Sequence, residues 1–384
     1  MAGLMGTRRG VALVAATAMA AAVLAGCGSS KSESSRPAPL ADFKSSLTMR
    51  TAWQVSVGNS RGAPLQPAVL ENAIYAAAAN GSLMRVTPAT GAVVWRIDTD
   101  LRLTSGVGSD GFVVAVGTNR GELLAYGADG KLLWRTQLSS DVLATPLVGR
   151  GVVIVRSTDH RVTAFEADSG KRRWSFSRTP PPLTLRSVSD MAFAGDNVLV
   201  GLPGGRLVSL ALSNGAARWE AVVAEPKGAT EVERLADVIG TLAVAGRDAC
   251  AAAFQGRLTC VDNGNGNLRW ARELAAGAGV AIDETRVYGV DISGAVAAHA
   301  RDSGASVWRN AQLANRQPSS PLALPTAVLV GDYRGYLHAL RPDSGEFAAR
   351  LSLDGAITAA PKPWGNGAIV QTQGGTIAFV TIER

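Results

Sequence analysis

Histidine and cysteine are both scarce in this chain of 384 residues, with three of each. The histidines, His160, His299 and His338, are far apart, and none lies in a metal-binding or Ser/His/Asp motif. Metal centres need clustered ligands, and hydrolytic catalysis commonly needs a histidine base beside its nucleophile. We therefore expect no catalytic residues, no bound metal and no cofactor.

Two of the three cysteines, Cys250 and Cys260, flank a predicted hairpin turn at Gln255-Gly256. An oxidising compartment would allow them to form a disulfide. With a two-residue turn Cys250 faces Val261, and the two sulfurs point to opposite faces of the hairpin. With an odd-numbered loop the two cysteines lie opposite each other and can bridge. We favour two separately buried thiols, and the disulfide stays open as the alternative.

Blocks of like charge and long helical patterns are also missing. Lys and Arg number 38, and removing Arg8 and Arg9 with the N-terminal signal described below leaves 36 against 31 Asp and Glu, a balance of +5. No run of five or six like charges occurs, so the sequence gives no support for nucleic-acid binding. No segment keeps a 3.6-residue apolar period over twelve residues, so we expect little helix.

The N-terminus has the layout of a secretory signal. Arg8 and Arg9 precede a largely apolar stretch, residues 10–26, which is shorter than a typical membrane span. The stretch ends in Leu24-Ala25-Gly26-Cys27, which resembles a bacterial lipobox, in which the cysteine thiol is acylated. We predict a signal peptide over residues 1–26 and a lipid anchor at Cys27. An ordinary signal peptide with an incidental cysteine is the alternative.

The residues after the anchor predict the location of the chain. Residues 27–50 are read as the acylated cysteine followed by a flexible polar tether that is rich in Ser at its start. Gly28, in place of Asp, resembles the sorting pattern for the outer membrane. The predicted location is therefore the periplasmic face of that membrane, with the chain held there by its lipid.

An internal repeat fills the rest of the chain. Between Trp95 and Trp308 the successive tryptophans are 39, 40, 45, 51 and 38 residues apart. Each of these six tryptophans follows a glycine by four residues; the glycines are Gly91, Gly130, Gly170, Gly215, Gly266 and Gly304. Asp, Asn, Ser or Thr before such a glycine favours a tight turn. A seventh copy at Gly345 has lost its tryptophan.

A repeat near 40 residues, with turns separating short apolar strands, is typical of a four-stranded propeller blade. Seven such units run from about Pro67 to Leu353, and residues 51–58 and 357–384 remain. These two remainders predict an eighth blade that pairs the N-terminal and C-terminal strands and closes the ring. The fold predicted for residues 51–384 is an all-β, eight-bladed β-propeller of antiparallel blades, with each tryptophan packed between neighbouring blades.

Two of the intervals between tryptophans are long, and their extra residues follow Trp174 and Trp219 at the same phase of the repeat. Equal phase places both insertions on one face of a propeller, on adjacent blades, and such insertions commonly bind partners. The first insertion contains Leu183, Leu185 and Arg186, and the second contains Asp237. The alternative for the two leucines is that they point inward from an ordinary strand.

The lipobox, the Gly-x-x-x-Trp units and these two loops together resemble the BamB family of outer-membrane β-barrel assembly lipoproteins, over nearly the whole chain. The resemblance implies a non-enzymatic scaffold that docks on a POTRA domain of BamA beside other subunits of the assembly complex. The resemblance also suggests direct contact with nascent outer-membrane proteins. The implied partner-binding residues are Leu183, Leu185, Arg186, Arg234 and Asp237. The second acidic position of the family motif is Ile239 here, which puts that half of the contact in doubt.

Two other functions compete with the scaffold. The same repeat resembles quinoprotein dehydrogenases, which carry pyrroloquinoline quinone and Ca²⁺ beside an adjacent pair of cysteines. This sequence has no such pair and is shorter than those enzymes usually are. A lipoprotein that binds a ligand in its central channel is the third possibility.

Overall fold

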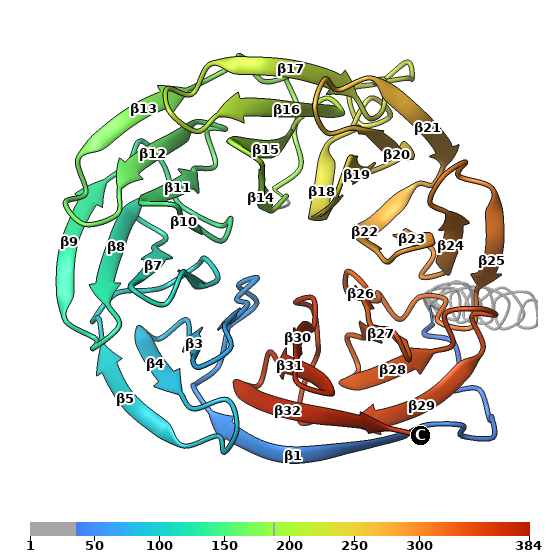
Figure 1. Cartoon of the computed structure of the whole chain (residues 1–384). Coiled ribbons are helices and arrows are strands. Elements are labelled where there is room, and N and C mark those ends of the chain that lie inside the picture. Colours follow the sequence, from blue (N-terminus) through green and yellow to red (C-terminus); the bar gives the residue numbers. More distant parts are fainter. Residues whose placement is uncertain (1–35, 187–188) are drawn as a thin grey trace, which may run out of the picture. The chain divides into compact units, whose positions relative to one another are not determined.

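The computed structural model describes residues 36–186 and 189–384, so the predicted anchor Cys27 lies outside the described residues. Residues Ala38–Arg384 form one compact unit. This unit is a ring of eight four-stranded antiparallel sheets (Figure 1), which confirms the predicted eight-bladed propeller. Within the described residues no helix is long and apolar enough to cross a membrane.

Blades are numbered from the first complete one along the chain. In blades 1 to 7 the strands run in sequence order from the centre outward, and in blade 8 the outermost strand is β1. Blades 1 and 2 comprise β2 (Ala68–Val69), β3 (Ile74–Ala77), β4 (Ser82–Val86), β5 (Val93–Asp98), and β6 (Gly108–Ser109), β7 (Val113–Gly117), β8 (Glu122–Gly127), β9 (Leu132–Gln137). Blades 3 and 4 comprise β10 (Leu147–Gly149), β11 (Val152–Arg156), β12 (Val162–Glu166), β13 (Arg172–Phe176), and β14 (Met191–Ala194), β15 (Asn197–Leu202), β16 (Arg206–Ala211), β17 (Ala217–Val222).

Blades 5 and 6 comprise β18 (Val238–Ala245), β19 (Asp248–Ala253), β20 (Arg257–Asp262), β21 (Leu268–Glu273), and β22 (Ala276–Ile282), β23 (Arg286–Asp291), β24 (Val296–Ala300), β25 (Ser306–Asn310). Blade 7 comprises β26 (Leu322–Ala323), β27 (Val328–Gly331), β28 (Tyr336–Leu340) and β29 (Phe347–Ser352). Blade 8 comprises β30 (Lys362–Trp364), β31 (Gly367–Gln371), β32 (Thr376–Glu383) and β1 (Thr48–Ser56). Its outermost pair, β1 with β32, joins the two ends of the chain as predicted.

The tryptophans hold neighbouring blades together, through contacts that run from one blade to the next. Trp219 of blade 4 donates its indole N–H to the carbonyl of Asn263 in the turn of blade 5, at 3.1 Å. Gly266 in that same turn lies under the indole ring, because a Cβ there would stand 2.6 Å from Trp219 Cε3. The other couples are Trp53 with Gly91, Trp95 with Gly130, Trp134 with Gly170, Trp174 with Gly215, Trp270 with Gly304 and Trp308 with Gly345. The repeated glycine is therefore required by the preceding blade's ring as well as by its own turn.

The missing tryptophan of blade 7 has a physical reason. Ala349 stands at the equivalent register, opposite Ala339. A tryptophan at this position would have to place its indole against a turn between β32 and β1. That turn does not exist, since the chain's two ends meet there. Residues 38–47 cover blade 7 instead. Phe43 packs on Phe347 with ring centroids 5.5 Å apart, and Ser46 N–H donates to the Ala348 carbonyl.

That packing shifts the start of the propeller unit. Residues 38–47 belong to the same compact unit as the blades, although the sequence suggested that the tether runs to residue 50. The propeller's first strand then starts at Thr48, three residues before the predicted start at residue 51.

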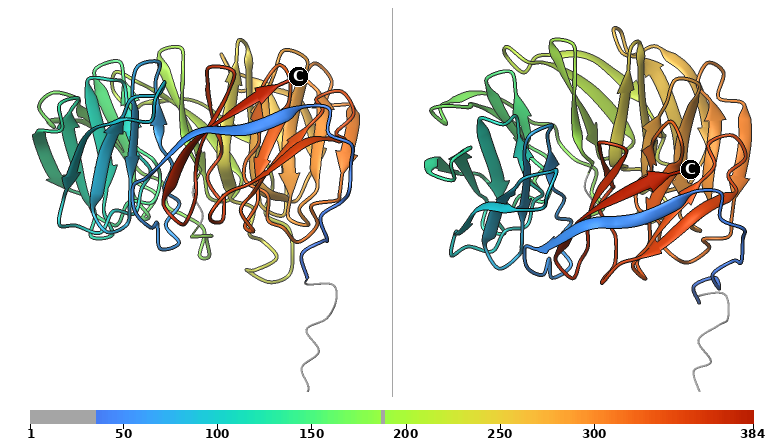
Figure 2. Two further views of the ribbon diagram at one scale, coloured as in Figure 1. Left: turned by 90° about the horizontal axis from the view of Figure 1, so that it is seen from below. Right: turned by 60° about the horizontal axis from the view of Figure 1, so that its bottom comes forward.

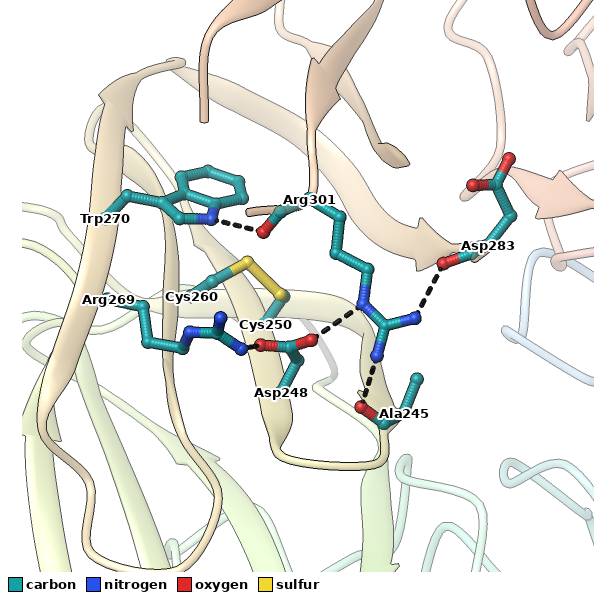
Figure 3. The surroundings of a disulfide bond; sticks show 8 residues. All are labelled: Ala245, Asp248, Cys250, Cys260, Arg269, Trp270, Asp283 and Arg301. Carbon is teal, nitrogen blue, oxygen red and sulfur yellow. Dashed lines mark hydrogen bonds and ion pairs between the residues drawn. A yellow bond between two sulfur atoms is a disulfide. The ribbon is translucent and has the colours of Figure 1, made fainter. Parts of the chain in front are cut away.

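The two cysteines of blade 5 form a disulfide, so the favoured prediction of separate thiols is wrong. The connection between β19 and β20 leaves Cys250 directly opposite Cys260 and Ala252 opposite Leu258. Five residues therefore separate the last pair, and Gln255 at their centre takes a left-handed conformation (φ 50°). The odd-numbered loop is the alternative that permits the bridge. Figure 3 shows the disulfide beneath Trp270, beside Asp248 with Arg269 and Arg301.

Candidate partner-binding face

The two long insertions lie on the same face of the ring. In each antiparallel blade the connection to the next blade and the turn between the second and third strands fall at the same end of the strands. Loop A (residues 177–190) joins β13 to β14, and loop B (residues 223–237) joins β17 to β18. Figure 2 shows loop B, in yellow, extending beyond the strands. We call this side of the ring the loop face.

Asp237 links the two loops from a buried position. Its side chain sits at the end of loop B with the residue only 3% exposed. One carboxylate oxygen accepts the backbone N–H of Leu185 in loop A at 2.6 Å, and the other accepts the N–H of Gly204 at 3.0 Å. In this arrangement the Asp237 carboxylate holds loop A in place, and its charge is buried. The resemblance described above implies that Asp237 is a partner-binding residue.

The two leucines of loop A divide between surface and core. Leu183 is 40% exposed, whereas Leu185 is partly buried against the blade 5 cluster that contains Ile239 and Trp270. Neither leucine lies in a strand, so the alternative of an ordinary inward-facing strand does not hold. Ile239, at the position where the resemblance implies an acid, thus supplies apolar surface near Leu185.

Arg186 is the exposed cation of loop A. Its side chain is 77% exposed, and Nη2 lies 2.8 Å from the Asp141 carboxylate at the start of the connection into blade 3. An ion pair this exposed adds little stability, so Asp141 does not hold Arg186 firmly.

Loop B is braced by its own backbone and side chains. The Glu233 carboxylate accepts the N–H groups of Ala229 and Thr230, while Glu233 N–H donates to the Thr230 hydroxyl, which is the reciprocal arrangement of a capping box. These bonds hold the pKa of Glu233 below its ordinary value. Arg234 donates to the Gly228 carbonyl and pairs with Glu231 at 3.1 Å.

The result of this bracing is an exposed apolar tip. Val232 is 60% exposed at the turn that Glu233 and Arg234 stabilise. Sequence analysis did not single out Val232, although the Thr-x-x-Glu spacing of a capping box marks the turn that carries it. Arg234, a predicted partner-binding residue, donates its hydrogen bonds to acceptors within loop B.

A pocket of about 140 Å³ opens beside loop A, in blade 3. It is lined by Leu143, Ala144, Arg156, Ser157, Thr158, His160, Thr184, Leu185 and Arg186. Burial lowers the pKa of Arg156 to about 10, against the opposing effect of the Asp237 and Asp190 carboxylates. Burial also lowers the pKa of His160, and the nearby charge of Arg156 lowers it further. Neither Arg156 nor His160 was assigned to this site from the sequence.

A quinone and its Ca²⁺ would lie in the central channel of the propeller. Gln66, just before the innermost strand β2, donates to the Thr145 hydroxyl and the Asp190 carboxylate, so these three side chains bond to one another. Among the described residues no group of three or more His, Cys, Asp or Glu side chains is placed to hold a metal ion. Cys250 and Cys260 are ten residues apart and bridge inside blade 5, so they do not supply the adjacent pair. In the part of the chain that the structure describes, the side chains present do not form the donor set which that cofactor needs.

Comparison with known proteins identifies relatives over nearly the whole chain. A family described as "Outer membrane protein assembly factor BamB" matches residues 79–310 and 292–384. A protein of the same description from Bordetella pertussis is 42% identical over 361 residues, covering 93% of this chain and 94% of the relative.

Solved structures agree with this at the level of fold. The crystal structure of BamB from Moraxella catarrhalis superposes with a TM-score of 0.81 at 26% identity, covering 87% of this chain and all of that one. A quinohemoprotein alcohol dehydrogenase from Comamonas testosteroni has a TM-score of 0.68 at 15% identity, covering 86% of this chain and 76% of its own. At that identity only the propeller fold is shared.

Proposed function

The chain belongs to the BamB family of outer membrane protein assembly factors, and from this we propose that it is a non-enzymatic scaffold of the outer-membrane β-barrel assembly complex. Its loop face docks on a POTRA domain of BamA and so helps to fold and insert outer-membrane proteins. A lipid on Cys27 holds it at the periplasmic face of the outer membrane.

The observation that carries the docking proposal is that two neighbouring loops, each held by hydrogen bonds, expose apolar side chains together with one cation. Leu183 and Arg186 stand on loop A, and Val232 stands on the tip of loop B. Leucine or valine beside arginine supplies apolar area together with a bidentate donor, which suits the centre of a protein interface. Loops held rigid before binding lose less conformational entropy when a partner arrives.

Asp237 and Arg234 contribute by positioning. The Asp237 carboxylate ties loop A to loop B, and Arg234 closes the turn below Val232. Asp237 is therefore a positioning residue, although the resemblance implies that it touches the partner.

The experiment is a pull-down of the full, detergent-solubilised chain from a membrane extract, compared with Leu183→Ala and Arg186→Ala. Both side chains are exposed, so neither change should unfold the propeller. We expect the unaltered chain to retain the POTRA-bearing barrel protein, and each variant to reduce its affinity by at least about tenfold.

The matched control is Phe112→Ala. Phe112 is 82% exposed in the turn between β6 and β7, which lies on the face of the ring opposite the loop face. This variant should retain the partner as well as the unaltered chain does. If the unaltered chain retains no POTRA-bearing protein, the assembly role is refuted for this chain.

A further inference from the structure

Arg156 breaks the repeat at one position of the ring. It is the last residue of β11, and the residues at the equivalent register of the other seven blades are Ala77, Gly117, Gly201, Ala252, Val290, Gly331 and Gln371. Six of these seven are small or apolar, and none is charged. Local departures from a repeating pattern concentrate where a protein has a function to perform.

The small residues at this register allow the connecting loop to pack down onto the blade. Gly117 lies against Val142 and Gly331 lies against Ile357, each a residue of the following connection. In blade 3 this register carries the long Arg156 side chain, which lines the pocket beside loop A. The arginine therefore replaces an apolar contact with a charged wall.

The Arg156 guanidinium is buried without a carboxylate partner. The residue is 7% exposed, and within the described residues its one hydrogen bond runs from Nη1 to the carbonyl of Gly201. In the described chain no Asp or Glu oxygen lies within 4.0 Å of an Arg156 nitrogen, the limit for an ion pair. The Asp237 and Asp190 carboxylates act on the guanidinium from further away. Charges buried in proteins are almost always paired, because an unpaired one is expensive to desolvate.

Arg156 and Arg186 are the cations that line the pocket, and the two hydroxyl groups beside them have already donated their hydrogens. The Ser157 hydroxyl already donates to Asp159, and the Thr158 hydroxyl donates to Asp141. The His160 ring nitrogen Nδ1 is buried and has no partner. Leu143 and Leu185 supply apolar walls. At about 140 Å³ the space is well below the roughly 300 Å³ at which small-molecule sites begin.

We propose that this pocket receives one acidic side chain of the protein docked on the loop face. Arg156 contacts that side chain at the buried bottom of the pocket, and Arg186 contacts it at the exposed edge. The inference rests on the proposed docking function and adds the chemistry of the group that is recognised. A carboxylate matches the planar, forked donors of a guanidinium, and its aliphatic stem fits between Leu143 and Leu185.

The test is the dissociation constant of the full chain for the periplasmic part of the barrel-forming partner, measured for the unaltered chain and for Arg156→Met and Arg156→Lys. Methionine keeps the apolar stem and removes the charge. We expect Arg156→Met to weaken binding by at least roughly tenfold, and Arg156→Lys to recover part of the loss.

The matched control is Arg150→Met. Arg150 belongs to the same blade and likewise donates Nη1 to a backbone carbonyl, that of Gly195, but it stands in the turn between β10 and β11 on the opposite face. It should leave the dissociation constant unchanged. If the unaltered chain binds and Arg156→Met binds equally well, the pocket inference is refuted while the docking function stands. If the unaltered chain does not bind at all, both are refuted.

Two further readouts separate recognition from a structural role. An arginine held for a ligand should not stabilise the free protein, so Arg156→Met should leave the melting temperature unchanged or raise it by a few degrees. A fall of more than about 5 °C would mark Arg156 as a structural brace instead. Each acidic residue of the partner's docking surface can be changed to its amide and combined with Arg156→Met in a double-mutant cycle. One of these acidic positions should be energetically coupled to Arg156, and the absence of any coupled position contradicts the inference.

Discussion

At the scale of single residues, the buried His338 is held by polar contacts inside blade 7. His338 is fully buried: its Nε2 lies 3.0 Å from the Asp332 carboxylate, and its Nδ1 accepts from Arg350 Nε at 3.2 Å. Arg350 in turn donates to the carbonyl of Ala41, in the segment that covers blade 7. The neutral ring therefore connects the interior of blade 7 to the N-terminal segment.

The protonation of His338 gives a pH dependence of stability. Burial lowers the pKa of His338, the Asp332 carboxylate opposes that shift, and the charges of Arg350 and Arg316 reinforce it. An unfolded histidine has a pKa of about 6.5, so below that pH the unfolded state takes up a proton that the folded state refuses. The contribution of neutral His338 to the free energy of unfolding should be constant above pH 6.5, and the free energy of unfolding should decline as the pH falls below that value.

Denaturant titrations between pH 5 and pH 8 measure this decline, and His338→Gln is the comparison. Glutamine cannot be protonated, so its slope below pH 6.5 should be shallower, by up to about 1.4 kcal/mol per pH unit for one proton. His160 and His299, whose pKa values burial also lowers, keep the remaining slope. Identical slopes for the two proteins would show that His338 does not titrate in this window.

The partner-binding residues were only partly predictable from single positions. Leu183, Leu185 and Arg186 were found because their loop resembles a family motif, and the structure places them together on loop A. The burial of Asp237 was not predictable, since it depends on where the backbone N–H groups of Leu185 and Gly204 lie in space. Arg156 gave no local signal, because only the eight-fold comparison of strand registers shows that it is unusual.

The repeated elements are stabilised by the tryptophan-glycine couples, and this is the part of the fold that the sequence predicted best. The spacing of four residues between glycine and tryptophan marks one strand and its turn, so six units could be counted directly, a seventh from Gly345, and the eighth from the two ends of the chain that remained. The direction of the contact could not be read off, because a glycine precedes its own blade's tryptophan in sequence but lies under that of the previous blade.

A substitution at one couple isolates the contact from the turn. Gly266→Ala places a Cβ at 2.6 Å from Trp219, in a backbone with φ of +75°. Gly151→Ala has the same φ of +75° and nothing within 4 Å. We expect Gly151→Ala to lower the free energy of unfolding by roughly 1–2 kcal/mol from its backbone alone.

Gly266→Ala should lose a further 1–3 kcal/mol, approximately, because the indole has to move. Urea unfolding of both variants measures the difference. Equal losses for the two would show that the ring contact adds nothing to the joint between blades 4 and 5.

The hairpin of blade 5 shows why the disulfide was missed at this scale. A one-residue change in loop length decides whether Cys250 faces Cys260 or Val261, and Gln255-Gly256 fits either loop. The outcome depends on Gln255 adopting a positive φ, which is uncommon for a residue of its type and gives no sequence signal.

At the scale of the whole molecule, the ring converts sequence phase into a common surface. Insertions that follow two consecutive tryptophans appear on one face, so the loop face could be predicted before any contact was known. The packing of residues 38–47 on blade 7 was not predictable, because it replaces a tryptophan contact that the junction between the chain's ends removes.

The most direct test of the docking face is photocrosslinking in native membranes. A photoreactive phenylalanine analogue is placed at Leu183 on the loop face or at Phe112 on the opposite face, both exposed on the surface. Docking through the loop face predicts a crosslink to the POTRA-bearing barrel protein from position 183 and none from position 112. A crosslink to that protein from position 112, with none from position 183, would contradict the assignment of the binding face.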